Sequence, residues 1–119
     1  MEGVDNINKR ETGIQYEQAA ADFLKGMGYS ILKQNYYCRY GEIDIIAEES
    51  RYIVFIEVKY RKNTMSGSPE SAVNGIKRHH IRQAALDFLI NSYGTEEIPC
   101  RFDIVAITGK QIHLIKDAF

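Results

Sequence analysis

Two segments of the chain place apolar residues three and four positions apart, the spacing of a helix with one buried face. In the first segment these residues run from Tyr16 to Met27, and the glycines of "GMG" at residues 26–28 are typical of a helix end. In the second segment, Asn74 is suited to cap the helix N-terminus. The sequence therefore predicts helices over residues 14–26 and from Asn74 to about Ser92, the second with a buried face made of Ile81, Ala84, Ala85 and Phe88.

Five apolar runs separated by turn-forming residues predict five strands. The second and third runs are apolar on both faces over much of their length, which favours a sheet covered by helices on each side. The predicted order is helix, three strands, helix, two strands, so the fold class is α/β with a central mixed sheet flanked by helices. In the fourth run, Arg101 and Asp103 are expected to form a structural ion pair. The predicted strands cover residues 29–37, 41–48, 51–61, 101–108 and 111–119, and residues 62–70 have the composition of a loop.

A length of 119 residues indicates one domain with a single core. Residues 1–12 are polar and unpatterned, so we expect a flexible N-terminal arm followed by one domain over residues 13–119. The net charge is −1, and any attraction to phosphate must therefore come from a local basic patch. No apolar stretch approaches the roughly 20 residues needed to cross a bilayer, so we expect a cytoplasmic protein without a membrane partner. Cys38 and Cys100 lack zinc-like spacing and are expected to be free thiols.

The segment "GEIDIIAEESRYIVFIEVKYR" at residues 41–61 is typical of two antiparallel strands joined by a polar turn. A turn centred in "EESR" makes the numbers of opposed residues sum to 101, which places Asp44 opposite Glu57. The same register places Glu42 opposite Lys59 on the same side of the sheet. The other side is predicted to carry Ile43, Ile45 and Ala47 against Val54, Ile56 and Val58.

Directly opposed carboxylates repel one another, and partial burial forces them to take up a proton or a cation. Asp44 and Glu57 together therefore predict a site for a divalent metal, since carboxylates, a carbonyl and waters suit magnesium. Lys59, on the same side as Glu57, could deprotonate a water or stabilise charge on a phosphate, which predicts metal-assisted phosphodiester hydrolysis. The alternative is a solvated cross-strand salt bridge, the common role of a Glu-x-Lys pair on a strand.

Four segments, "YEQAAADFL", "NYYCRYGEIDIIAE", "VFIEVKYR" and "RFDIV", resemble the YraN-type family of uncharacterised bacterial proteins. That family resembles a branch of the PD-(D/E)XK nuclease superfamily, similar to the archaeal Holliday junction resolvases. The resemblance implies a restriction-endonuclease-like core in the order αβββαββ, Mg²⁺ or Mn²⁺ as cofactor, and DNA as substrate. Because such resolvases act as dimers, it also implies a homodimer. It makes Asp44 and Glu57 metal ligands, Lys59 the catalytic lysine, and Glu17 on the first helix a further acidic catalytic residue.

Basic and aromatic residues flank the charged end of the predicted hairpin and are candidates for contacts with nucleic acid. The segment "GIKRHHIRQ" on the second helix is the densest positive patch of the chain. Its Lys77 shares the inward face and could reach the carboxylates, whereas Arg78 and Arg82 point outward. A solvated basic face and aromatic packing are the alternatives. The candidates are Arg39, Tyr40, Arg61, Lys62, Lys77, Arg78 and Arg82.

Two functions of different classes follow from these patterns. The first is a metal-dependent endonuclease that hydrolyses phosphodiester bonds of branched or structured DNA. The second is a non-catalytic nucleic-acid-binding or protein-interaction module on the same core, which the balanced net charge favours.

Overall fold

The computed structural model of the chain describes residues 2–62 and 73–119, with side chains described from residue 13 onward. The elements follow the predicted order of helix, three strands, helix and two strands. Most of the predicted loop at residues 62–70 lies outside the described residues. The elements are α1 (Glu2–Gly26), β1 (Ser30–Cys38), β2 (Gly41–Glu49), β3 (Tyr52–Arg61), α2 (Gly75–Tyr93), β4 (Cys100–Thr108) and β5 (Gln111–Ile115).

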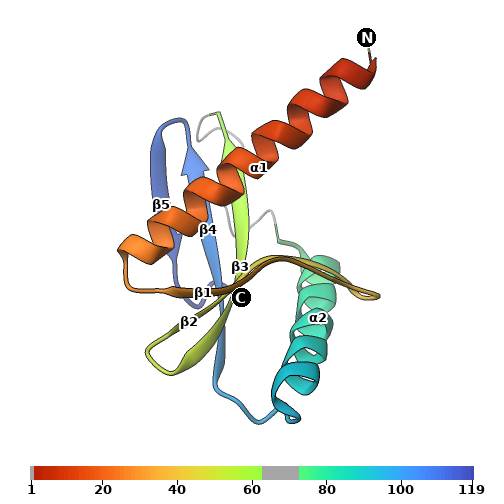
Figure 1. The fold of residues 1–119 in the computed structure, drawn as a ribbon, viewed down its shortest axis with the longest axis vertical. Coiled ribbons are helices and arrows are strands. Elements are labelled where there is room, and N and C mark those ends of the chain that lie inside the picture. The colour runs from red at the N-terminus through yellow and green to blue at the C-terminus, as the bar shows by residue number, and fades with distance from the viewer. Residues whose placement is uncertain (1, 63–72) are drawn as a thin grey trace.

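Helix α1 begins at Glu2, well before the predicted start near residue 14. The prediction rested on apolar spacing, which a helix needs only where it packs against other elements. In Figure 1 the N-terminal turns of α1 extend past the sheet, so a polar sequence is sufficient there. Residues 2–12, which were expected to form a flexible arm, are helical and continue directly into the predicted helix.

The C-terminus of α1 lies where the two glycines predicted it. The N–H of Tyr29 donates to the carbonyl of Leu24 at 2.9 Å, and the N–H of Gly28 donates to that of Lys25 at 3.1 Å. These two bonds form a Schellman motif, which needs a residue in the left-handed region at the position of Gly28, whose φ is 93°. Within residues 2–62 and 73–119, neither helix is long and apolar enough to cross a bilayer.

Helix α2 begins at the predicted cap. The Asn74 side chain accepts a hydrogen bond from the backbone N–H of Lys77 at 2.9 Å, and Gly94 ends the helix in the left-handed conformation. The buried face is the predicted one with Leu89 added to it.

The Asn74 cap supports a first prediction. The Asn74→Ala variant should lower the free energy of unfolding by about 1 kcal/mol, because it leaves the Lys77 N–H without its acceptor. The Asn74→Asp variant, which keeps an acceptor oxygen, serves as the control and should stay close to wild type. Urea denaturation followed by circular dichroism measures both. Equal losses in the two variants would show that the cap contributes nothing.

All five strands form one mixed sheet in the order β1-β2-β3-β4-β5. Neighbouring strands are antiparallel except β3 and β4, which run parallel because α2 makes the crossover between them. The predicted α/β class with a central mixed sheet is confirmed.

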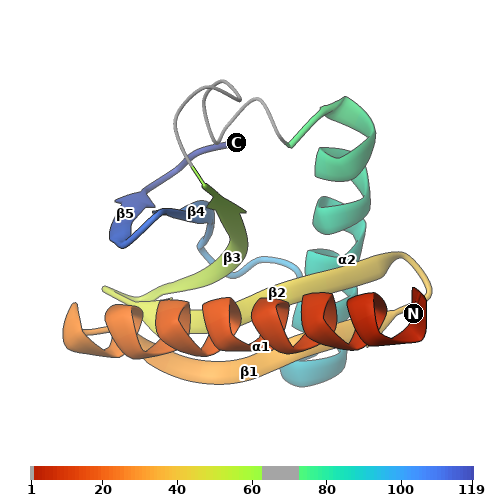
Figure 2. The same cartoon turned by 90° about the horizontal axis from the view of Figure 1, so that it is seen from above.

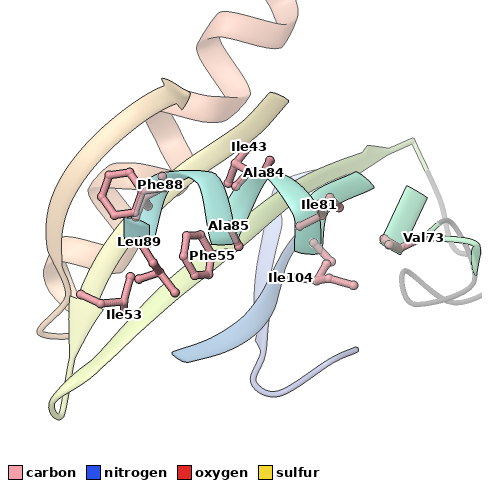
Figure 3. Packing of buried hydrophobic residues seen from close by; sticks show 12 residues of the cluster. Ile43, Ile53, Phe55, Val73, Ile81, Ala84, Ala85, Phe88, Leu89 and Ile104 are labelled. Carbon is pink, nitrogen blue, oxygen red and sulfur yellow. The ribbon is translucent and has the colours of Figure 1, made fainter. Parts of the chain in front are cut away.

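The sheet separates two apolar clusters, each covered by one helix, as the apolar faces of the strands predicted (Figures 1 and 2). On one face α1 contributes Ala20, Ala21 and Leu24 to a cluster with Val54 and Ile56 of β3. Figure 3 shows the other face, where α2 packs over β2, β3 and β4. The labelled members of that cluster are Ile43, Ile53, Phe55, Val73, Ile81, Ala84, Ala85, Phe88, Leu89 and Ile104.

Ile43 lies on the face opposite to its predicted one. It belongs to the cluster under α2, close to Ala84 in Figure 3, whereas Ile45 and Ala47 lie in the cluster under α1 as predicted. The prediction assumed regular alternation along the whole hairpin, which holds only where the strand is paired on both sides. Ile43 lies beyond the last residue of β2 that pairs with β3.

The β2–β3 hairpin has the predicted register over its paired length, from Glu49 with Tyr52 to Ile45 with Ile56. In the described chain the pairing ends there. Asp44 and Glu57, predicted to be direct partners, therefore lie one step past the last pair, and the predicted opposition of Glu42 and Lys59 is not part of the ladder either. This departure from the predicted hairpin creates the site described below.

Arg101 and Asp103 form the predicted structural ion pair, with Arg101 Nε 2.9 Å from Asp103 Oδ1. Asp103 is fully buried and also accepts hydrogen bonds from the Tyr29 hydroxyl and from the backbone N–H of Asp117. A buried carboxylate satisfied in this way fixes the start of β4 against the C-terminal segment. Cys38 and Cys100 are both free.

Candidate functional site

The site lies where β2 and β3 separate. Residues 41–43 of β2 pair with β1, while residues 57–61 of β3 pair with β4, so the two strands follow different neighbours beyond Ile45 and Ile56. Asp44 lies in the fork between them. Its Oδ2 accepts a hydrogen bond from the backbone N–H of Val58 at 2.9 Å, in place of a ladder bond. The fork therefore holds a carboxylate inside the sheet.

A hollow of about 270 Å³ opens from this fork toward the N-terminal part of α2. Asp44 and Glu57 both line it, so they lie on the same side of the sheet, as the predicted register required. Lys77 reaches it from α2, as the helical spacing predicted. The remaining lining residues are Tyr40, Gly41, Glu42, His80 and Ile81.

Glu57 is the most deeply buried carboxylate of the hollow, with 3% of its surface exposed. Burial, and after it the charge of Asp44, raises the pKa of Glu57 to about 7. Its Oε2 lies 3.4 Å from Nζ of Lys77. Its Oε1 is buried and has no hydrogen-bond partner in the described part of the chain. A carboxylate oxygen buried in this way is costly unless a proton or a cation joins it.

Asp44 is joined by two further acidic side chains. One oxygen of each carboxylate of Glu17, Glu42 and Asp44 lies within 4.8 Å of the other two, among the residues whose side chains are described. Burial raises the pKa of all three carboxylates, and the charge of Asp44 raises those of Glu17 and Glu42 further. Glu17 comes from α1 and the other two from β2, so two elements far apart in the sequence converge on this acidic group.

Two lysines partly neutralise these carboxylates. Burial and the neighbouring Lys77 lower the pKa of Lys59, against the attraction of Glu57 and Asp44. Burial also opposes the charge on Lys77, but its hydrogen bond to Lys59 and the charges of Glu57 and Asp44 outweigh burial, so its pKa is raised. Lys77 therefore keeps its proton, while Lys59 releases one more readily than a free lysine does.

The ion pair between Lys77 and Glu57 supports a second prediction. The Lys77→Met variant should raise the pKa of Glu57 above about 7, because it removes a positive charge that holds this pKa down. Carbon-detected NMR titration of the Glu57 side-chain carboxyl measures the change. The Lys77→Arg variant keeps the charge and should leave the titration near that of wild type. An unchanged or lower pKa of Glu57 in the Met variant would contradict this role of Lys77.

Asn35 is a residue of the site that the sequence patterns did not predict. It lies in β1 between two residues that pair with Ile43 and Ile45, and its φ of 55° places it in the left-handed region. Such a conformation is rare in a strand, and asparagine tolerates it better than most residues. A hydrogen bond between Asn35 and Glu17 offsets part of the rise in the pKa of Glu17. An asparagine, a residue depleted in strands, inside the predicted first strand was a signal that could have pointed to it.

The predicted nucleic-acid contacts fall into two groups. Arg39 and Tyr40 lie beside the hollow, with the guanidinium 4.7 Å from the Tyr40 ring centre, and Arg61 and Lys62 follow at the end of β3. Arg78 and Arg82 do not line the hollow. Nε of Arg78 donates to the carbonyl of Val73, and Arg82 donates to the carbonyl of Phe119, so both hold neighbouring backbone segments.

The donor set of the hollow fits a hard divalent cation. It offers carboxylate oxygens from Asp44 and Glu57, and one of these oxygens is buried without a partner. Mg²⁺ and Mn²⁺ prefer such oxygen ligands, whereas a zinc site would be expected to contain thiolates or several imidazoles.

Comparison with known proteins confirms the expected membership in a family of uncharacterised bacterial proteins. The chain is similar to a UPF0102 protein of Lachnoclostridium phytofermentans, with 46% identity over 113 residues, covering 95% of this chain and 96% of the relative. A UPF0102 protein of Saccharophagus degradans is 43% identical over 109 residues, covering 92% of each chain. The model of the uncharacterised protein family UPF0102 matches residues 16–107, a span that includes Glu17, Asp44, Glu57 and Lys59. The chain therefore belongs to the uncharacterised protein family UPF0102.

Proposed function

We propose that the protein is a metal-dependent endonuclease that hydrolyses phosphodiester bonds of branched or structured DNA. The observation that carries the proposal is the pair of carboxylates, Asp44 and Glu57, that line one open hollow with two lysines beside them. Four acidic side chains with raised pKa values lie together here, and one buried oxygen of Glu57 has no partner in the described chain. This arrangement supports a site for a bound cation, because the nearby lysines neutralise the carboxylates only in part.

Asp44 and Glu57 would hold the Mg²⁺ or Mn²⁺ ion, with Glu17 and Glu42 beside Asp44. When bound, the ion supplies positive charge to the phosphate and to a water ligand. The fork in the sheet holds Asp44 through the Val58 N–H, and the packing around Glu57 restricts its motion, so both ligands are preorganised.

Lys59 is proposed to accept the proton of the attacking water. Its lowered pKa makes the neutral amine accessible, so Nζ can accept a proton. Lys77 is proposed to orient Glu57 through the ion pair of 3.4 Å and to offer positive charge to the phosphate. Glu17 is proposed as the further acidic catalytic residue, positioned by α1 and Asn35.

The element order supports a restriction-endonuclease-like core, and with it the likeness to the PD-(D/E)XK nucleases. The hairpin of β2 and β3 carries Asp44, Glu57 and Lys59, and α1 brings Glu17 to the same place, as the resemblance implies. Holliday junction resolvases act on branched DNA as dimers, so we propose DNA as partner and a homodimer as the working form. The proposed phosphate and base contacts are Arg39, Tyr40, Arg61, Lys62 and Lys77.

One observation favours the non-catalytic alternative. Lys77 already provides a positive charge beside Glu57, so part of the negative charge of the carboxylates is neutralised without a metal ion. In that case the core would act as a nucleic-acid-binding or protein-interaction module.

Cleavage assays separate the two functions. Purified protein is incubated with four-way junction, flap and single-stranded DNA, with and without Mg²⁺ or Mn²⁺, beside the Asp44→Ala variant. Metal-dependent cleavage that the variant lacks supports the endonuclease. Salt-dependent retention of DNA without hydrolysis supports the binding module. If the protein neither cleaves nor retains any of these substrates, both nucleic-acid functions are rejected.

A further inference from the structure

A second hollow, of about 570 Å³, lies on the other side of the acidic group, between α1 and β1. Figure 2 shows α1 running along β1 and β2 in this region. Glu17 and Glu42 line this hollow and also belong to the acidic group around Asp44. A ligand bound in the hollow would therefore lie next to the proposed metal site. The other lining residues are Gly13, Ile14, Asn35 and Tyr37.

The lining combines exposed apolar surface with hydrogen-bond acceptors. Tyr37 is 71% exposed and Ile14 is 57% exposed, which is unusual for large apolar side chains at a concave surface. The carboxylates of Glu17 and Glu42 can accept hydrogen bonds from amino groups, and the Asn35 amide can both donate and accept. Among the described lining residues none is basic, so the hollow does not suit a phosphate group.

Asn35 is held at this hollow in the left-handed conformation inside a strand. Conformations of this kind are maintained against a local energy cost and cluster at binding and catalytic sites. Asn35, Glu17, Tyr37 and Glu42 line the same hollow, Asn35 lowers the pKa of Glu17, and the charge of Glu42 raises the pKa of Tyr37. The polar groups of the hollow therefore lie close enough to one another to act on a single ligand.

We infer that this hollow binds one unpaired nucleobase of the nucleic acid whose backbone lies at the acidic group. The inference rests on the proposed function and adds the substrate class, namely strands with unpaired nucleotides beside the scissile phosphate. Tyr37 stacks on the base, since exposed aromatic rings are the common platform for single-stranded nucleic acid. Glu17 and Glu42 accept hydrogen bonds from exocyclic amino groups, as carboxylates do with cytosine. Thymine has no amino group, so thymine should be the weakest occupant.

A fluorescent base tests the inference. A short DNA strand carries 2-aminopurine at one unpaired position and hydrolysis-resistant phosphorothioate linkages around it, and it is titrated with protein in Mg²⁺. Stacking on Tyr37 should quench the fluorescence. The Tyr37→Ala variant should lose the quenching and bind the strand between about fivefold and a hundredfold more weakly. The Tyr37→Phe variant keeps the ring and should behave as wild type. The Tyr52→Ala variant removes another exposed tyrosine, at the far end of β3, and should change nothing.

Outcomes for the hollow and for the metal site are separate. Calorimetric titration of Mg²⁺ into the wild-type protein without DNA reports on the metal site alone. If Mg²⁺ binds and DNA is retained, but quenching is absent or equal in Tyr37→Ala, the base site is overturned while the proposed function stands. Equal affinity for oligo-dT and oligo-dC would also overturn the assigned role of the carboxylates. If the wild type binds neither Mg²⁺ nor DNA, both proposals fail together.

Discussion

The Asp44→Asn variant is expected to lose Mg²⁺ binding in calorimetry and to lose metal-dependent DNA cleavage. Asparagine has nearly the shape of aspartate and keeps an oxygen that can accept the Val58 N–H, so the fork between β2 and β3 should stay intact. What the variant removes is the negative charge that would bind the ion. Even the outer partners of metal ligands contribute roughly 10- to 100-fold to affinity or activity, so losing a ligand charge should lower both by at least about a hundredfold.

Thermal unfolding of this variant shows whether a loss of Mg²⁺ binding comes from the changed site or from an unfolded protein. Burial raises the pKa of Asp44, which means that its charge destabilises the folded protein. Asp44→Asn should therefore unfold at the same or a higher temperature than wild type when no metal is present. Glu48→Gln, at an exposed position of the same strand, is the matched control and should keep both binding and cleavage. Full Mg²⁺ affinity in Asp44→Asn would remove Asp44 from the proposed site.

The Glu57→Gln variant is expected to be more stable than wild type at pH 8 in the absence of metal. Burial and the charge of Asp44 raise the pKa of Glu57 from 4.5 to about 7, so its ionisation opposes folding. The folded protein holds the proton at pH values where the unfolded chain has released it. Stability from this group is therefore complete below about pH 4.5 and is lost as the pH rises to about 7. That difference corresponds to about 3 kcal/mol at most, and it already includes the opposing charge of Lys77.

Urea denaturation of Glu57→Gln and wild type at pH 5 and pH 8 measures this effect. The variant should gain on the order of 1 to 3 kcal/mol at pH 8 and much less at pH 5, so its stability should depend less on pH. Saturating Mg²⁺ should stabilise the wild type by about 2.7 kcal/mol at a hundred times the dissociation constant, and should not stabilise the variant. Glu48→Gln again serves as the control. A variant that is less stable than wild type at pH 8 would mean that the Lys77 ion pair outweighs the burial of charge at Glu57.

Such a gain in stability on removing a charge is what a functional site predicts. A carboxylate kept in a costly position is expected where activity needs it and where stability alone would not retain it. The contrast with Asp103 is instructive, because that buried carboxylate has partners for both oxygens and supports β4. Glu57 has one oxygen in an ion pair and one with no partner in the described chain.

Local patterns in the sequence predicted most of the fold. The cap at Asn74, the glycine stop at Gly28 and the hairpin register each depend on residues close together in the chain. The start of α1 was wrong because a helix that extends past the sheet needs no apolar stripe. The face of Ile43 was wrong because alternation was extended past the paired part of β2.

The sequence by itself determined which residues could carry charge into the core, and that Asp44, Glu57 and Lys59 share one region of a hairpin. Only the tertiary structure decided how they meet. The predicted register implied that β2 and β3 pair continuously. In the structure they separate beyond Ile45 and Ile56, where β2 stays paired with β1 and β3 with β4, and the carboxylate of Asp44 lies in the fork between them. The positions of Glu17, Asn35 and Lys77 likewise depend on contacts between distant elements. Such contacts follow from how two helices pack on a twisted sheet, and no spacing within a single segment encodes them.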